Sequence, residues 1–132
     1  AHYPNVTFVV IGLREEVLEG LRNRPNVIIS KDYGTSIIED LAIVRTSLMY
    51  MATSSGVTTI ALFSDLPYLM FQMPTFAIHR CGLKSGERLS FMTDKQEWFE
   101  DTIQVTPKLL FDEFKKLYSK IDKRSWLDRV SR

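Results

Sequence analysis

The stretch SLMYMATSSGVTTIALFSDLPYLMF, residues 47–71, decides the fold because a turn of small residues separates two of its apolar runs. The turn is Thr53-Ser54-Ser55-Gly56, and the apolar run before it predicts a strand over residues 48–52. Residues 57–64 are predicted as a short helix and residues 68–71 as the next strand. Such a turn would present free backbone N–H groups at the carboxyl edge of a sheet, where a helix dipole favours an anion.

The helix over residues 57–64 has a competing interpretation as a strand, since its first half consists of the β-branched residues Val57, Thr58, Thr59 and Ile60. Two strands joined by the turn would then form a hairpin. The helix is favoured because Ser54 or Ser55 can cap its first turn, and Asp65-Leu66-Pro67 interrupts the chain before the next apolar run.

The chain before this stretch predicts alternating strands and helices. Strands are predicted over residues 7–11 and 26–30, and the first is a continuous apolar run typical of a strand covered on both faces. Helices are predicted over residues 15–23 and 37–45.

The helix over residues 37–45 begins at a capping box, Ser36-Ile37-Ile38-Glu39, in which the serine and glutamate side chains satisfy free N–H groups. Its expected outward residues are Glu39, Asp40 and Arg45. Its expected buried stripe consists of Ile37, Ile38, Leu41, Ala42 and Val44.

The chain after residue 71 is predicted to be irregular over residues 72–89, with a short strand over residues 89–92 and one helical turn over residues 95–101. Thr106-Pro107 is a strong helix start. Leu110, Phe114, Leu117 and Ile121 then recur at helical spacing, so a helix is predicted to about Ile121. The basic residues that crowd its end are interpreted as a cationic helix end.

This order of elements predicts an α/β protein with a doubly wound (Rossmann-like), mostly parallel sheet, helices on both faces and a long C-terminal helix. With 132 residues and 45% apolar composition, residues 1–132 are expected to form a single domain. The first residue is not methionine, and we expect the chain to be the C-terminal lobe of a longer two-lobed protein.

The charge balance and the cysteine content exclude several classes. Lys and Arg number 17 against 16 Asp and Glu, so no overall field favours nucleic acid or an anionic membrane. No apolar run reaches the length of a membrane span. The single cysteine, Cys81, excludes an intramolecular disulfide and fits a reducing compartment, so a cytoplasmic location is expected.

Several common catalytic motifs are missing from the sequence, namely GxGxxG, the Walker Gly-Lys-Ser/Thr, HExxH, paired cysteines and GxSxG. His2 and His79 are too few and too far apart for a zinc site made by the protein alone. We therefore expect no metal and no cofactor.

The spacing of Ser55, Gly56, Ala61 and Pro67 resembles that of the C-terminal nucleotide-sugar-binding lobes of GT-B glycosyltransferases, heptosyltransferases especially. Those lobes carry a strand, a Ser-Gly turn, a helix with alanine at its middle and a proline that opens the next strand. The double serine Ser54-Ser55 is similar to a turn in fucosyltransferases of the α-1,6 type. The likeness covers residues 6–71 as an architecture and a shorter segment around the turn as a motif.

This resemblance implies that the chain binds the nucleotide-sugar donor of an enzyme that transfers a sugar to an acceptor hydroxyl, with the catalytic base in the other lobe. The donor would be a substrate and not a cofactor. Its diphosphate would be held by Thr53, Ser54, Ser55, Gly56 and Val57. Thr59 departs from the family pattern, because heptosyltransferases usually have histidine there, and the identity of the donor stays open.

Four further residues are candidate donor contacts: Thr59, Asp65, His79 and Arg80. Arg80 could pair with phosphate oxygens, and Asp65 could contact a ribose or act as a base. Each has a plainer interpretation, since Asp-Leu-Pro is common turn chemistry and His79-Arg80 could be an exposed loop pair. The serines could likewise be no more than a helix cap.

A second hypothesis is a stand-alone flavodoxin-like module that binds a ligand or a protein and has no chemistry of its own. A missing lobe could also leave an apolar face that drives association into a homo-oligomer, with the regions of Trp98 and Trp126 as candidates.

Overall fold

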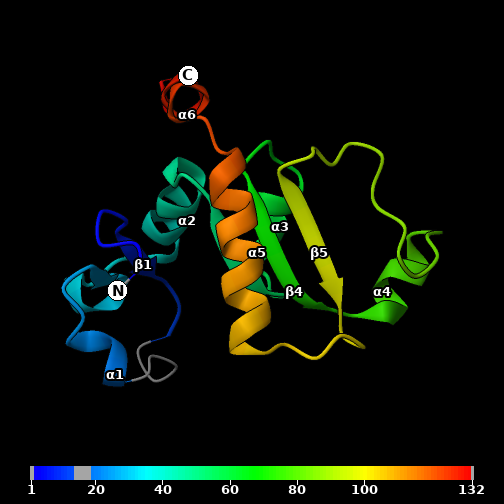
Figure 1. Ribbon diagram of the computed structural model, residues 1–132, viewed down its shortest axis with the longest axis horizontal. Helices are drawn as coiled ribbons and strands as arrows, with labels where there is room; N and C mark the ends of the chain where they lie inside the picture. Colours follow the sequence, from blue (N-terminus) through cyan, green and yellow to red (C-terminus); the bar gives the residue numbers. More distant parts are fainter. Residues whose placement is uncertain (1, 14–18, 132) are drawn as a thin grey trace. The chain divides into compact units, whose positions relative to one another are not determined.

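A computed structural model describes residues 2–13 and 19–131 of the chain (Figure 1). The chain divides into two compact units, Ala1–Ile43 and Val44–Arg132. Each unit contains its own parallel sheet, of two and of three strands, so the α/β class is confirmed. The single domain and the doubly wound arrangement stay predictions.

The first unit pairs β1 (Phe8–Val10) with β2 (Val27–Ile29) in parallel, with Val9 opposite Ile28. Both strands were predicted, but the expectation that the first is covered on both faces is wrong, because Phe8 and Val9 are exposed. Helix α1 (Glu19–Arg22) is the described part of the helix predicted over residues 15–23, whose residues 15–18 lie outside the described residues. A 3₁₀ helix, η2 (Ser30–Tyr33), follows β2.

Helix α2 (Ile37–Thr46) begins as predicted, because the Ser36 N–H donates to Glu39 Oε2 at 2.6 Å and the Glu39 N–H donates to Ser36 Oγ at 3.2 Å. The predicted faces of this helix are confirmed only in part. Val44 is buried, and Glu39 and Arg45 are exposed, as predicted. However, Ile38 is 75% exposed, and Asp40, which was expected to face outward, is 3% exposed. Residues 40 and 44 share one helical face, and Asp40 can be buried there because other side chains supply hydrogen-bond partners.

The second unit has the strand order β3-β4-β5, with all three strands parallel. The strands are β3 (Tyr50–Thr53), β4 (Tyr68–Met73) and β5 (Gln96–Glu100). Thr53 pairs with Phe71, and this parallel register excludes the hairpin alternative. The helices are α3 (Thr58–Leu62), α4 (Thr75–Arg80), α5 (Pro107–Lys120) and α6 (Lys123–Val130).

The core of the second unit is built on the central strand β4. Leu69 and Phe71 pack with Leu117 of α5, and the Phe71 ring stacks on Phe99 with a centroid separation of 5.0 Å. Tyr68 and Met70 are also fully buried. Figure 1 shows α5 in front of this sheet and α3 behind it.

The start of α5 is confirmed, since Thr106 is its N-cap, Pro107 opens the helix, and Thr106 Oγ1 accepts the Leu109 N–H at 3.1 Å. The predicted helical turn over residues 95–101 is wrong, because this segment contains β5. Gln96 and Trp98 are buried and alternate with partly exposed residues, which is the period of a strand.

Two further predictions after residue 71 are corrected. No strand forms over the described residues 89–92, and the segment predicted as irregular contains α4. The chain after α5 continues in α6, whose N-cap Asp122 accepts the Arg124 N–H at 2.9 Å. This local cap explains why the basic C-terminal segment forms a second helix instead of a frayed helix end.

Candidate functional site

The five residues predicted to bind a diphosphate begin at Thr53, the last residue of β3, and continue into the turn at the carboxyl edge of the three-stranded sheet. Residues 53–56 are exposed and Val57 is partly buried. The turn is tied to the central strand, because the Ser54 N–H donates to the Phe71 carbonyl at 3.2 Å. It is closed by the buried Thr58, whose Oγ1 accepts the Ser55 N–H at 3.1 Å and donates to the Ser55 carbonyl.

The prediction that Ser54 or Ser55 caps the helix is wrong. The N-cap of α3 is Val57, and no side chain caps this helix. The Thr58 hydroxyl instead binds the backbone of Ser55, which precedes the helix, and both serine residues are exposed at the sheet edge. Because α3 is five residues long, its dipole contributes little to anion binding.

The backbone of the turn retains hydrogen-bonding capacity. Within residues 2–13 and 19–131, the N–H groups of Gly56 and Val57 donate to no protein acceptor. A Cβ added to Gly56 would meet no atom within 4 Å, so the fold itself does not require glycine at this position. The turn therefore combines three hydroxyls, two unused N–H groups and open space above the backbone.

The other predicted contacts are dispersed. Thr59 is exposed on α3, close to the turn in sequence and in space. Asp65 lies between α3 and β4, at the amino edge of the sheet, where it lines a cavity of about 240 Å³ together with Lys95 and Arg129. Four residues of a parallel strand span about 13 Å, so Asp65 does not join the turn.

His79 and Arg80 occupy the last turn of α4, the helix that follows β4. The His79 Nε2 and Ser85 Oγ atoms are 3.4 Å apart, and the Arg80 guanidinium lies 5.6 Å from the centroid of the Phe76 ring. Both residues are exposed and have neighbours of their own. The structure thus places Thr59 beside residues 53–57 and Asp65 at the other edge of the sheet, and within the described chain no hydrogen bond or ring contact joins His79 or Arg80 to the turn.

Two acidic residues outside the predicted site, Glu100 and Asp101, lie at the carboxyl edge. Thr75 Oγ1 donates to Asp101 Oδ1 at 2.7 Å, and the Gly86 N–H donates to Glu100 Oε2 at 2.8 Å. Asp101 thereby binds the start of α4, and Glu100 binds the loop that follows α4.

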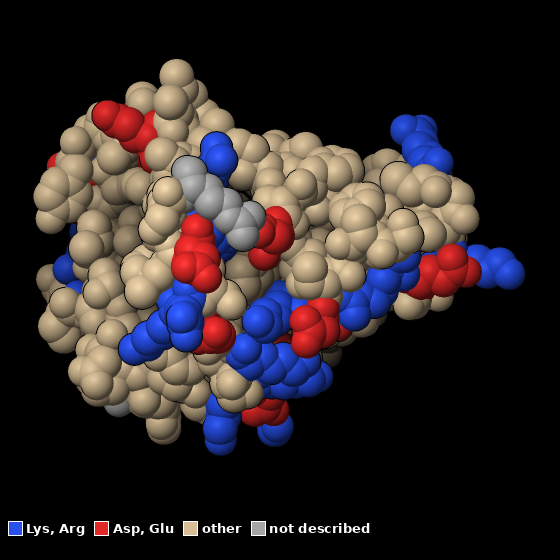
Figure 2. Space-filling view, turned by 90° about the horizontal axis from the view of Figure 1, so that it is seen from above, with Lys and Arg blue, Asp and Glu red and all other residues tan. Residues whose placement is uncertain are grey.

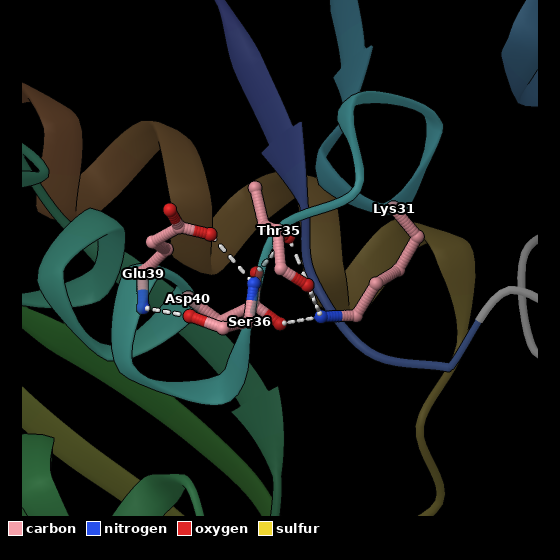
Figure 3. Close-up of polar contacts among 5 residues, drawn as sticks. All are labelled: Lys31, Thr35, Ser36, Glu39 and Asp40. Atoms are coloured by element: carbon pink, nitrogen blue, oxygen red, sulfur yellow. Dashed lines mark hydrogen bonds and ion pairs between the residues drawn. The ribbon is translucent and has the colours of Figure 1, made fainter.

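The first unit holds a separate polar cluster, which Figure 3 shows in close-up. Lys31 Nζ lies 2.6 Å from Asp40 Oδ2 and donates to the Thr35 carbonyl at 2.7 Å, while Thr35 Oγ1 donates to Asp40 Oδ1 at 2.6 Å. Burial alone would raise the pKa of Asp40, but the hydrogen bonds from Lys31 and Thr35 and the charge of Lys31 outweigh it and lower that pKa. The cluster anchors the start of α2.

Charges on the surface are mixed in sign. On the face shown in Figure 2, Lys and Arg side chains lie among Asp and Glu side chains. On α5, Lys108 pairs with Asp112, and Lys116 Nζ lies 3.7 Å from Glu113 Oε2. The basic C-terminal segment is therefore interleaved with acidic partners.

Among the described residues, no group of three or more His, Cys, Asp and Glu side chains could hold a metal ion. In residues 2–13 and 19–131, no helix has the length and apolar character that crossing a membrane requires. Cys81 is a free, exposed thiol.

Trp98, named as part of a candidate self-association surface, is buried in the second unit. Trp126 is partly buried, and its Nε1–H donates to the Thr46 carbonyl at 2.8 Å.

Comparison of the chain with protein-family models, with curated proteins and with solved structures found no match.

Proposed function

We propose that residues 53–57 bind the diphosphate of a nucleotide sugar, and that the chain is the donor-binding half of a glycosyltransferase that transfers the sugar to an acceptor hydroxyl. The observation that carries the proposal is the pair of unused N–H groups of Gly56 and Val57, in an exposed hydroxyl-rich turn at the carboxyl edge of a parallel sheet. Ligands of open α/β sheets bind at this edge.

The chemistry of the turn suits an anion. Phosphate oxygens can accept hydrogen bonds from the Gly56 and Val57 N–H groups, and the hydroxyls of Thr53, Ser54 and Ser55 can add further donors. Because these donors are uncharged, they would stabilise the diphosphate as it leaves the sugar without holding it as tightly as a lysine cluster. The acceptor site and the catalytic base belong, in this proposal, to another lobe.

The proposal extends to the fold. It takes the chain as one doubly wound, Rossmann-like domain in which α5 is the long C-terminal helix, as the resemblance to GT-B enzymes implies. The parallel order of β3, β4 and β5 supports this arrangement. A cytoplasmic location belongs to the proposal too, since a nucleotide sugar would be its substrate.

A nucleotide titration tests the proposal. GDP, UDP and ADP, and the corresponding nucleotide sugars, are added in turn to the isotope-labelled chain, and backbone amide signals are followed. Binding is expected to shift the Gly56 and Val57 signals most, because their N–H groups acquire acceptors. If none of the nucleotides at millimolar concentration moves any signal of residues 53–58, the proposal is wrong.

An alternative function is a flavodoxin-like module that binds a ligand or protein without catalysis. The observation that favours it is an exposed aromatic pair, Phe63 and Phe91, which are 68% and 51% exposed and have ring centroids 5.6 Å apart. Exposed aromatic residues in contact are typical of a recognition surface. Under this alternative, replacing both rings with serine would abolish partner binding, and nucleotides would leave residues 53–58 unmoved.

A further inference from the structure

The central strand β4 has one exposed residue in an otherwise buried sequence. Its residues Tyr68, Leu69, Met70, Phe71 and Met73 are buried, whereas Gln72 is exposed. A central strand of a parallel sheet is usually apolar throughout, because both of its faces are covered. The amide of Gln72 is therefore a departure from the pattern of its own strand.

The backbone of Gln72 is also unusual. Its φ is 55°, and among the described residues it is the one non-glycine with a positive φ. The pairing of β4 with β5 is irregular between Met70 and Met73, which places Gln72 in a bulge. A long side chain gains nothing from this conformation, which glycine adopts more easily, so the presence of glutamine here requires another reason.

The bulge lies beside the turn after β3. Phe71 is paired with Thr53, and its carbonyl accepts the Ser54 N–H at 3.2 Å. Gln72 is the next residue along β4, so its backbone is adjacent to Ser54 across the two strands. Bulges at the ends of strands often redirect a side chain toward a binding site.

We infer that Gln72 is a specificity-determining residue of the site at residues 53–57, where its side-chain amide binds an uncharged hydroxyl or carbonyl group joined to the diphosphate. This inference rests on the proposed function. An amide supplies two N–H donors and one oxygen acceptor without charge, so it matches a sugar or nucleobase better than a phosphate. Within the described part of the chain, the Gln72 side chain makes no hydrogen bond that binding would have to break.

The backbone conformation allows a clean test with Gln72→Gly. Glycine removes the amide and relieves the positive φ, so the variant is expected to fold with an unchanged or slightly higher melting temperature. Gln72→Asn is the matched control, because asparagine tolerates this backbone and keeps an amide on a shorter side chain. Affinities of both variants and of the natural chain are measured by calorimetry for pyrophosphate, GDP, UDP and their hexose conjugates.

Gln72→Gly is expected to lower the affinity for at least one nucleotide or nucleotide sugar by about 5-fold, which is the loss expected from one hydrogen-bonding group. The affinity for pyrophosphate should be unchanged. Asparagine should restore part of that loss. A loss for bare nucleotides locates the contact on the nucleoside, and a loss confined to the conjugates locates it on the sugar.

Equal affinity of Gln72→Gly and the natural chain for every ligand would overturn the inference and leave the proposed function standing. An equal loss for pyrophosphate would overturn it as well, because Gln72 would then act on the turn itself. If the natural chain binds none of these ligands, the proposed function fails and this inference fails with it.

Discussion

The buried carboxylate of Asp40 offers the sharpest test of the energetics of the first unit. Asparagine has nearly the same shape, so Asp40→Asn creates no cavity, but it places an amide opposite the Lys31 ammonium, 2.6 Å from Asp40 Oδ2. Removing one partner of a fully buried ion pair costs about 3 to 5 kcal/mol. The side chain of Asp40 is 4% exposed and that of Lys31 is 22% exposed, so part of the cost is relieved by water. We expect a loss of about 2 to 3 kcal/mol.

The assay must report on the first unit, and both tryptophans, Trp98 and Trp126, belong to the second. Urea unfolding is therefore followed by far-ultraviolet circular dichroism and by hydrogen exchange of α2. The matched control is Asp112→Asn on α5, where the ion pair with Lys108 is exposed and is worth about 0.5 kcal/mol or less. If Asp40→Asn and Asp112→Asn destabilise the chain equally, the assigned role of the buried cluster is wrong.

The pH dependence of the same variant has a definite sign. The pKa of Asp40 is lower in the folded chain than its ordinary value of 3.8, so the folded state favours the ionised form. The stabilisation is complete above pH 3.8 and is lost as the pH falls through the lowered pKa. The difference in unfolding free energy between the natural chain and Asp40→Asn should thus be largest near neutrality and shrink in acid, whereas a constant difference down to the acid limit would contradict the ion pair.

Two further predictions concern buried polar groups of the second unit. Gln96 is 1% exposed, its Nε2 donates to the Ser64 and Leu66 carbonyls at 2.7 and 3.0 Å, and its Oε1 accepts the Thr93 N–H at 3.0 Å. Gln96→Leu should cost about 2 to 3 kcal/mol in urea unfolding, because it removes three hydrogen bonds and leaves the buried Leu66 carbonyl without this partner. A loss below about 0.5 kcal/mol would contradict this expectation. The Tyr68 hydroxyl has no hydrogen-bond partner among the described residues. Burial raises the pKa of this hydroxyl to about 12; the charge of Arg88 lowers the pKa, and the charge of Glu97 raises it further. Tyr68→Phe should be as stable as the natural chain at pH 7 or up to about 1 kcal/mol more stable. Between pH 10 and 12 the natural chain should lose stability, because Tyr68 ionises at lower pH in the unfolded chain than in the folded chain. Tyr68→Phe should lose less stability over this range, because it has no hydroxyl at this position. A less stable Tyr68→Phe at pH 7 would show that the hydroxyl has a partner.

The features that sequence patterns predicted correctly are local. The capping box at Ser36 and Glu39 and the Thr106-Pro107 start of α5 depend on residues within one helical turn, so their hydrogen bonds follow from spacing alone. The strands β3 and β4 were also located from local sequence, because a buried strand of a parallel sheet requires a continuous apolar segment.

The features that sequence patterns missed depend on partners far along the chain. β5 contains Gln96 and two glutamates, and its polar residues suit a strand only because Gln96 binds carbonyls about 30 residues away. Asp40 was expected to face solvent, because the sequence does not show that Lys31 and Thr35 approach it. A polar residue in a core is predictable only when its partner is known.

In the candidate site too, the sequence predicted some features and missed others. Its position followed from the order of strand, turn and helix, and the structure keeps residues 53–57 at the carboxyl edge. The sequence did not predict how the turn is closed, because the hydroxyl of Thr58, and not of Ser54 or Ser55, makes the closing hydrogen bond. Gln72 could not be found from spacing, since no pattern signals a single left-handed residue in an apolar strand.

The central claim, that residues 53–57 bind a nucleotide diphosphate, is tested most directly by comparing Gly56→Ala with Gly20→Ala. Added Cβ atoms at both positions meet no atom of residues 2–13 or 19–131 within 4 Å, and neither glycine has a positive φ, so both variants should fold as the natural chain does. Calorimetric titration with GDP and UDP should show at least a 10-fold loss of affinity, about 1.4 kcal/mol, for Gly56→Ala and no loss for Gly20→Ala. Equal nucleotide affinity of the two variants, or the absence of any binding to the natural chain, would contradict the claim.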